Sequence, residues 1–209
     1  MNLLGGIIIL GIIIISMVLH ELAHGSVALL LGDTTAKEDG RLTLNPLKHL
    51  DPVMSVLLPL LSYFMGGVVF GGAKPVPVNF AKLKGGVWGM ALVAFAGPFV
   101  NFLLAFLAFL GLNYINYSGS KIIETVLTNF LFVNLGFGVF NLFPIPPLDG
   151  SRIVYAILPD VVRDFFDRIE RVGIIIVYAL ILLGGGIFSS IMSGAMSGIL
   201  NGFYWIIGM

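Results

Sequence analysis

Long apolar runs dominate the chain, and their lengths match the thickness of a lipid bilayer. A spanning helix needs about 20 mostly apolar residues. Five runs reach that length, at 3–31, 87–112, 122–144, 171–189 and 190–208. A sixth run, 52–70, is shorter and is interrupted by Pro59 and by Gly66-Gly67. The pattern predicts an all-α polytopic membrane protein with about five spanning helices and one re-entrant or broken segment.

Three polar stretches, 32–51, 71–86 and 149–171, separate the runs. In the third, the helical spacing of apolar residues at 160–170 predicts a helix lying on the membrane surface. In the second, the alternation over 74–78 (KPVPV) predicts a small extended, β-like element at the interface, because proline favours sheet edges. Such an edge could dock an extended substrate, and an ordinary interfacial loop fits the residues equally well.

Composition places the whole chain in the membrane class. Of its residues, 58% are hydrophobic and only 11% are charged, whereas a soluble domain has about 25% charged residues. No polar stretch is long enough for a core of its own, so we expect a single membrane-embedded domain over 1–209. The net charge of zero gives no reason to expect a nucleic-acid partner, and the lack of Cys excludes disulfides and thiolate metal sites. The first run lacks a basic leader, so we expect a span and not a signal peptide.

The first apolar run carries His20-Glu21-Leu22-Ala23-His24, an HExxH motif. Residues four apart on a helix share a face, so both imidazoles can reach one metal ion. Glu21 is rotated by about 100° from His20 and is placed to act on water instead of the metal. The pattern is typical of two zinc ligands and a general base. Ionisable residues inside a span are costly, which favours a metal site further.

A zinc site of this kind uses three protein ligands and leaves one position open. The candidates for the third ligand are His49, Asp51, Glu124 and Asp149. Asp149 stands out, because prolines stop the preceding helix and Gly150 frees the backbone in the segment 141–150 (NLFPIPPLDG). A carboxylate there can point into a helix bundle, but a simple interfacial turn fits the same residues. Glu124 is discounted because it lies at the opposite end of its predicted helix from Asp149.

Three motifs, in order, resemble those of the site-2 protease family of intramembrane zinc metalloproteases. They are HExxH at 20–24, GPFVN at 97–101, which resembles the GPxxN element, and NxxPxPxLDG at 141–150. The resemblance covers residues 15–151 and core helices at approximately 3–31, 87–112 and 122–148. It implies one Zn²⁺ per chain held by His20, His24 and Asp149, with Glu21 as the catalytic base. It implies a zinc metalloendopeptidase that cleaves transmembrane protein substrates in regulated intramembrane proteolysis.

The stretch 32–79 resembles the compact bacterial-type branch of that family, which implies a prokaryotic plasma membrane. The HExxH motif begins at residue 20, so we expect no helix before the first one. We expect no PDZ module, because the stretches between the core helices are too short for one, and no C-terminal CBS module. The spacing of Gly194 and Gly198 favours packing within the chain over a dimer motif, and no pattern sets an oligomeric state.

Four further polar residues are candidates for secondary roles. Asn101 and Asn141 match the family motifs and are interpreted as substrate or oxyanion contacts. Asn134 shares a face with Asn141, and we expect it to make interhelical hydrogen bonds. His49 fits a surface position best, while a gate over the zinc or an exchangeable ligand are the alternatives.

The distribution of Lys and Arg predicts the topology. To ligate one metal ion, His20 and Asp149 must lie at the same depth in the membrane. An odd number of crossings must then separate their helices. The run 87–112 is one crossing, so 52–70 cannot be another. The polar stretches 32–51, 71–86 and 149–171 then share one face with ten Lys and Arg residues, against Lys121 alone on the other. Positive residues collect on the cytoplasmic side. The active site is therefore expected nearer the cytoplasmic face, with the N-terminus outside.

Two alternatives belong to other functional classes. A membrane metal transporter would place several weak sites along a pathway, whereas this chain clusters its candidate ligands. A catalytically inactive zinc-binding membrane scaffold would not need Glu21.

Overall fold

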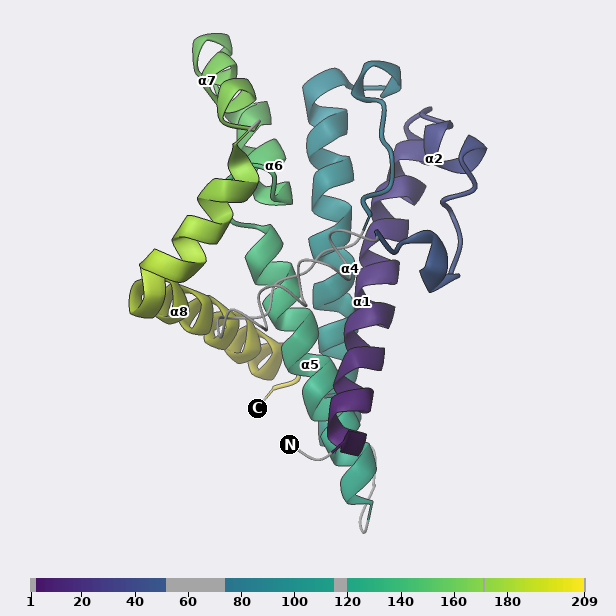
Figure 1. Ribbon diagram of the computed structural model, residues 1–209. Helices are drawn as coiled ribbons and strands as arrows, with labels where there is room; N and C mark the ends of the chain where they lie inside the picture. Colours follow the sequence, from purple (N-terminus) through teal and green to yellow (C-terminus); the bar gives the residue numbers. More distant parts are fainter. Residues whose placement is uncertain (1–2, 52–73, 115–119, 171, 209) are drawn as a thin grey trace.

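The computed structural model describes residues 3–51, 74–114, 120–170 and 172–208 (Figure 1). All regular elements in these ranges are helices. The long ones are α1 (Leu3–Leu30), α4 (Gly86–Tyr114), α5 (Lys121–Asn141) and α8 (Gly173–Ile206), and the shorter ones are α2 (Thr35–Glu38), α6 (Asp149–Ile157), α7 (Asp160–Glu170) and the single turns η1 (Pro46–Lys48) and η3 (Phe80–Lys82). The predicted all-α polytopic membrane fold is confirmed. Four helical segments in the described ranges are long and apolar enough to span a bilayer: Gly5–Leu30, Gly86–Tyr114, Lys121–Asn141 and Leu183–Ile206.

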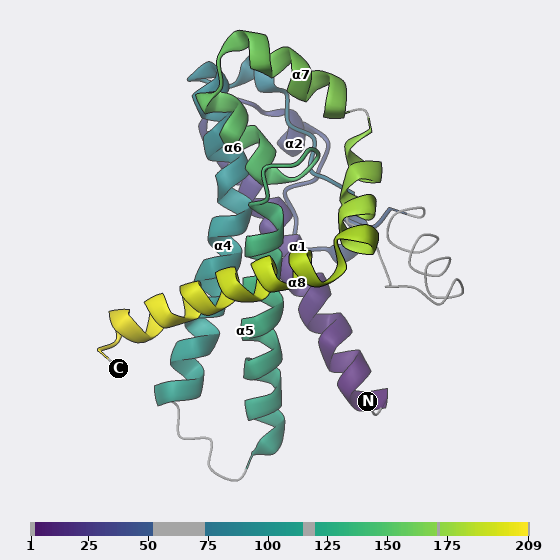
Figure 2. The same cartoon turned by 90° about the vertical axis from the view of Figure 1, so that its left-hand side faces the viewer.

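Helices α1, α4 and α5 run side by side and form the core (Figures 1 and 2), with α4 in contact with both of the others. The side of α4 that faces its neighbours is rich in small residues, including Ala94, Gly97, Ala105 and Ala108, which are buried. Small residues let helix backbones approach closely in a membrane, where packing replaces the hydrophobic effect as the driving force. This close approach brings α4 against the HExxH face of α1.

The last two predicted spans form one helix, α8, in the structure. Its backbone bends sharply at Gly185, which has φ 36° and ψ −113°. Glycine adopts positive φ at little cost, so the run Gly184-Gly185-Gly186 turns the helix without a loop. The part before the bend, from Gly173, is shorter than the roughly 20 residues that a span needs. The expectation of spans at 171–189 and 190–208 was therefore wrong for the first of them.

The part of α8 after the bend runs across α4 and α5 (Figure 2). Phe203 of α8 is buried in the apolar cluster that also contains Phe109 of α4 and Leu135 of α5. The ring centroids of Phe203 and Phe109 are 5.6 Å apart in a tilted arrangement, a geometry that aromatic pairs favour. This cluster fixes α8 to the half of the bundle that lies away from the polar loops.

The polar stretches meet at one end of the bundle, as the charge pattern predicted. The Lys84 N–H donates to the Leu31 carbonyl at 2.8 Å, and the Asn79 N–H donates to Asp33 Oδ2 at 2.6 Å. The Arg152 guanidinium lies 5.1 Å from the centre of the Phe80 ring. These contacts join the segments 32–51, 74–86 and 149–170. The predicted re-entrant segment 52–70 lies outside the described residues, but the segments that flank it lie at the same end.

Asp33 connects the loops at the polar end of the bundle through hydrogen bonds. Its side chain is fully buried and accepts hydrogen bonds from the Thr35 hydroxyl, the Thr35 N–H and the Asn79 N–H. Burial disfavours the charged form, but these hydrogen bonds outweigh it and hold the pKa of the Asp33 carboxyl below its usual value. The ionised carboxylate thus ties the end of α1 to the approach to α4.

The predicted surface helix at 160–170 is present as α7, with the same bounds. The predicted core helix 122–148 ends earlier, since α5 stops at Asn141 and α6 begins at Asp149. Pro144, Pro146 and Pro147 in between cannot donate helical hydrogen bonds. A Cβ on Gly150 would collide with the carbonyl oxygens of Leu142 and Phe143, so the close fold-back of α6 needs glycine there.

The predicted β-like element is not a strand in the described part of the chain. Residues 74–79 form a non-helical connection, and their backbone groups bond to loops and side chains instead of to a neighbouring strand. The Lys74 N–H donates to the His49 carbonyl at 2.8 Å. We call residues 74–79 the strap, because they run along α1 toward η3.

Candidate metal centre

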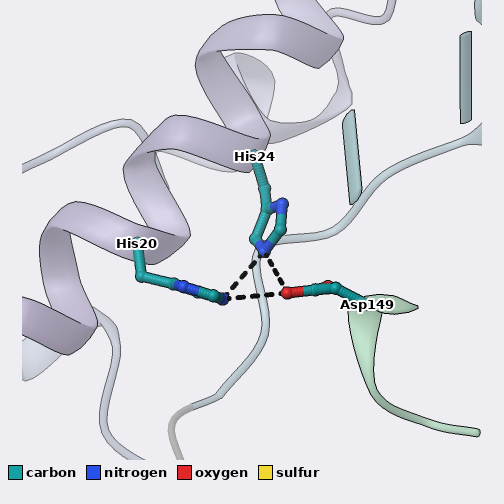
Figure 3. Close-up of side chains that lie close together, drawn as sticks. All are labelled: His20, His24 and Asp149. Carbon is teal, nitrogen blue, oxygen red and sulfur yellow. Dashed lines mark hydrogen bonds and ion pairs between the residues drawn. The ribbon is translucent and has the colours of Figure 1, made fainter. Parts of the chain in front are cut away.

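Three ligand atoms converge where α1, α4 and α6 meet (Figure 3). His20 and His24 lie one turn apart on α1, and their Nε2 atoms are 3.0 Å apart. Asp149, the first residue of α6, places its Oδ2 atom 3.2 Å from His20 Nε2 and 3.3 Å from His24 Nε2. Both imidazoles are buried and Asp149 is half-buried. The structure therefore brings together three residues that the sequence singled out as candidate ligands.

The hydrogen bonds behind the imidazoles determine which nitrogens carry protons. His24 Nδ1 lies 2.7 Å from the Val93 carbonyl oxygen, which can only accept. His20 Nδ1 lies 2.6 Å from Asn101 Oδ1. In the neutral imidazoles both Nδ1 atoms are therefore the donors, and both Nε2 atoms keep their lone pairs. The rear hydrogen bonds fix the tautomer and the ring orientation, as they do in metal-ligating histidines.

This arrangement fits a divalent cation. Asp149 Oδ2 is buried and has no hydrogen-bond donor among the described residues, and it faces two unprotonated Nε2 atoms. Three lone-pair-bearing atoms this close repel one another unless a proton or a metal ion lies among them. In a tetrahedral zinc site with bonds of ~2.0–2.1 Å, the ligand atoms lie about 3.3 Å apart. The observed separations of 3.0 to 3.3 Å agree with that geometry.

A chain of buried polar side chains supports His20 from behind. Asn101 Nδ2 of α4 donates to Asn134 Oδ1 of α5 at 2.9 Å, and Asn134 Nδ2 donates to Ser16 Oγ of α1 at 2.9 Å. All three residues have no exposed surface. The expected interhelical bonding of Asn134 is confirmed. Asn101 was interpreted as a substrate or oxyanion contact, but its position is behind His20, where it orients the imidazole.

Gly97 of α4 forms the wall beside the ligand atoms. A Cβ built on Gly97 would lie 2.5 Å from His24 Nε2 and 2.6 Å from His20 Nε2. Real Cβ atoms do not come this close to other heavy atoms, so any side chain here would push the imidazoles away. In the sequence, Gly97 stands out only as part of the motif at 97–101. Its position in a predicted helix was nevertheless informative, since a glycine in a helix interior often marks a place where another segment packs closely.

Glu21 lies beside the ligand group and is not part of it. Its side chain is partly exposed, and its Oε2 atom accepts a hydrogen bond of 2.7 Å from the Val76 N–H of the strap. The neighbouring histidines face Asp149, while Glu21, about 100° around α1 from His20, meets the strap. The placement agrees with the prediction that Glu21 does not ligate the metal.

The remaining two predicted site residues, Asn141 and His49, make other contacts in the structure. Asn141 Nδ2 donates to the Phe137 carbonyl at 3.0 Å within α5, so the structure shows a helix-capping contact for it. His49 is fully buried, and its Nε2 donates to the Thr43 carbonyl at 2.8 Å. The surface position expected for His49 was wrong, because the side chain is buried and bonds back to the loop that precedes it. Within the described ranges, the group of His20, His24 and Asp149 does not include His49.

Comparison with known proteins places the chain among metalloproteases. The family model described as "Peptidase family M50" matches residues 116–184. The chain is 36% identical over 200 residues to "Putative zinc metalloprotease YwhC" of Bacillus subtilis, covering 91% of this chain and 88% of that protein.

Two mycobacterial relatives named "Putative zinc metalloprotease Rip2" are also similar. The one from Mycolicibacterium smegmatis is 36% identical over 139 residues, and the one from Mycobacterium tuberculosis strain H37Rv is 33% identical over 142 residues. Each alignment covers 66% of this chain and 52% of the relative. No solved structure matches the chain.

Proposed function

The chain belongs to peptidase family M50, the site-2 protease family, and on that premise we propose that His20, His24 and Asp149 hold its zinc and that Glu21 is its general base. It is an integral, multi-pass intramembrane zinc metalloprotease. The observation that carries the residue assignment is the convergence, beside Glu21, of two Nε2 atoms whose Nδ1 atoms face acceptors and of one carboxylate oxygen that has no donor among the described residues. The predicted protease function is confirmed.

Each protein group has a separate task in peptide hydrolysis. His20, His24 and Asp149 would hold the zinc ion, which when bound would lower the pKa of water toward 7 and polarise the substrate carbonyl. Glu21 accepts the proton of the attacking water and delivers it to the leaving amine. Asn101 and the Val93 carbonyl keep the imidazoles in the tautomer and orientation that ligation needs. Gly97 leaves the space that the ligands require.

We infer that the substrates are transmembrane segments of other membrane proteins. The HExxH turn lies inside the apolar segment Gly5–Leu30, which is long enough to span a bilayer. A peptide bond must reach that depth to be cleaved, and segments that already lie in the bilayer do so without a transfer cost. A membrane metal transporter would need several ligand groups along a path, whereas one group is found in the described ranges.

We also propose that the site lies nearer the cytoplasmic face. His20 and His24 are in the half of α1 that leads into the polar end of the bundle. Contacts join the three polar stretches at that end, and those stretches hold all Lys and Arg residues of the chain except Lys121. The positive-inside rule places such an end in the cytoplasm.

The ligand assignment is tested by comparing Asp149→Ala with His49→Ala. Asp149→Ala removes one of three ligands and should lower the zinc content of the purified protein far below one ion per chain. His49→Ala removes a buried imidazole outside the ligand group and should retain the zinc, although it lowers thermal stability. Zinc retained in Asp149→Ala and lost in His49→Ala would reassign the third ligand to His49.

A further inference from the structure

One peptide group of the strap lies between a buried cation and the proposed catalytic base. Arg41 Nη2 donates to the Pro75 carbonyl oxygen at 3.2 Å, and the Val76 N–H of the same peptide unit donates to Glu21 Oε2 at 2.7 Å. Arg41 Nη2 also donates to the Lys74 carbonyl oxygen at 2.7 Å. Guanidinium, peptide dipole and carboxylate are thus connected in series, with the positive group at the oxygen end and the negative group at the N–H end.

No ion pair within the described part of the chain explains the burial of Arg41. Its exposed fraction is 7%, and in the described ranges no carboxylate lies within ion-pair distance of its guanidinium. Among the described residues, the guanidinium donates to the carbonyl oxygens of residues 74 and 75. A buried charge is costly unless the structure compensates it, and here the compensation comes from the strap that contacts Glu21.

The sequence of the strap restricts the conformation of the peptide group that joins Pro75 to Val76. Lys74 and Val76 each precede a proline, which restricts both to extended backbone conformations, and Pro75 and Pro77 have fixed φ. Gly25, one turn beyond Glu21 on α1, lets the strap lie close, since a Cβ there would be 2.9 Å from Val76 Cγ1 and 2.5 Å from Leu42 Cδ2. The Val76 N–H is therefore aimed at Glu21 by a stiff segment pressed against α1.

We propose that Arg41 is a positioning residue for Glu21 and acts through the peptide group that joins Pro75 to Val76. The guanidinium holds the strap in place, and its hydrogen bond to the Pro75 carbonyl strengthens the N–H of the same unit as a donor. The Glu21 carboxylate is thereby held beside the ligand group in one orientation. This proposal rests on the assignment of Glu21 as the base.

The first test is amide hydrogen exchange, which needs no substrate. Because residues 75 and 77 are prolines, a fragment covering the strap carries amide hydrogens at 74, 76, 78 and 79 only. Glu21→Ala and Arg41→Met should each speed exchange at Val76 by at least about tenfold, and Arg41→Lys should fall between Arg41→Met and the wild type. Unchanged exchange at Val76 in both Arg41 variants would overturn the proposal.

The second test is cleavage of a quenched-fluorescent peptide containing one apolar span, with zinc content measured in parallel. Arg41→Met should lower kcat roughly 10–100-fold with little change in KM and with one zinc per chain retained. Arg41→Lys, which keeps the charge, should recover part of kcat. A fall in zinc content that accounts for the loss of activity would show a merely structural role and would contradict the proposal.

Val76→Pro provides a backbone test, because it removes the donor itself. It should lower kcat as Arg41→Met does, and the double variant should be no slower than the worse single variant, since both changes break one chain of hydrogen bonds. Val78→Pro is the matched control, because no hydrogen bond of the Val78 N–H is found among the described residues. Equal effects of the two proline variants would refute the mechanism. If Glu21→Gln itself cleaved normally, the assignment of the base would fail, while hydrogen exchange at Val76 would still decide the coupling.

Discussion

Replacing Gly97 by alanine should displace the metal ligands while leaving the fold intact. The added Cβ would lie 2.5 Å from His20 Cε1 and His24 Nε2 and 2.6 Å from His20 Nε2. Ordinary contacts of a Cβ atom begin near 3.4 Å, so the rings would have to retreat by roughly 0.8–0.9 Å. Zinc–ligand distances tolerate only about 0.2 Å. Both imidazoles are on α1, so the retreat must separate α1 from α4 or rotate the rings off their rear hydrogen bonds.

The size of the effect follows from the cost of overpacking. Inserting a methyl group into a filled site costs about 1–3 kcal/mol. If the protein relieves this strain by giving up the ligand geometry, the zinc Kd rises by about 10–100-fold. Cleavage should fall at least in proportion. The strain is smaller than the stability of a typical domain, so the helical content of the purified protein should be unchanged.

The measurement is zinc affinity by competition with a chelator, together with far-UV circular dichroism. Gly136→Ala is the matched control, because it is also a helical glycine but has no heavy atom within 4 Å of its built Cβ. That change should leave zinc binding unaltered and should stabilise α5 by about 0.5–1 kcal/mol. Wild-type zinc affinity and wild-type cleavage in Gly97→Ala would refute the idea that Gly97 makes room for the metal.

Two further predictions concern the support of His20 and the orientation of the chain. Asn101→Leu removes the acceptor of His20 Nδ1 and should weaken zinc binding about 10–100-fold. Asn134→Leu, one hydrogen bond further away, should affect zinc less, and equal losses in the two variants would contradict the ranking. Cysteines introduced at positions 37 and 82 should both react with impermeant reagents from the cytoplasmic side only. The two loops are joined by the hydrogen bond from the Asn79 N–H to Asp33 Oδ2, which neither substitution removes. Labelling from opposite sides would rule out the shared face.

The sequence was sufficient for the elements whose signal is local or periodic. Apolar runs of bilayer length predicted α1, α4 and α5, and the amphipathic spacing at 160–170 predicted α7. The HExxH spacing placed two imidazoles on one face of a helix. The polar breaks between runs also predicted which loops share an end, because crossing parity and the distribution of Lys and Arg both constrain the topology.

Features that depend on contacts between distant segments were not accessible from the pattern. The run of glycines at 184–186 can end a helix or bend it, and only packing decides between a loop and the kink at Gly185. Asn101 carried a motif signal, but a motif cannot say whether its amide meets a substrate or an imidazole. The pattern suggested a surface position for His49, because nothing local in the sequence shows that this side chain is buried and that its Nε2 donates to the Thr43 carbonyl. The link from Arg41 to Glu21 passes through a backbone group, which no residue pattern records.

The most direct test of the account is the comparison of wild type with Glu21→Gln. Glutamine keeps the size and the hydrogen-bonding capacity of the side chain but cannot accept the proton of the attacking water. We predict that both purified proteins contain about one zinc ion per chain and that only the wild type cleaves a single-span membrane substrate. Cleavage by Glu21→Gln at the wild-type rate would contradict the assignment of Glu21 as the base, and loss of its zinc would show that Glu21 is a ligand.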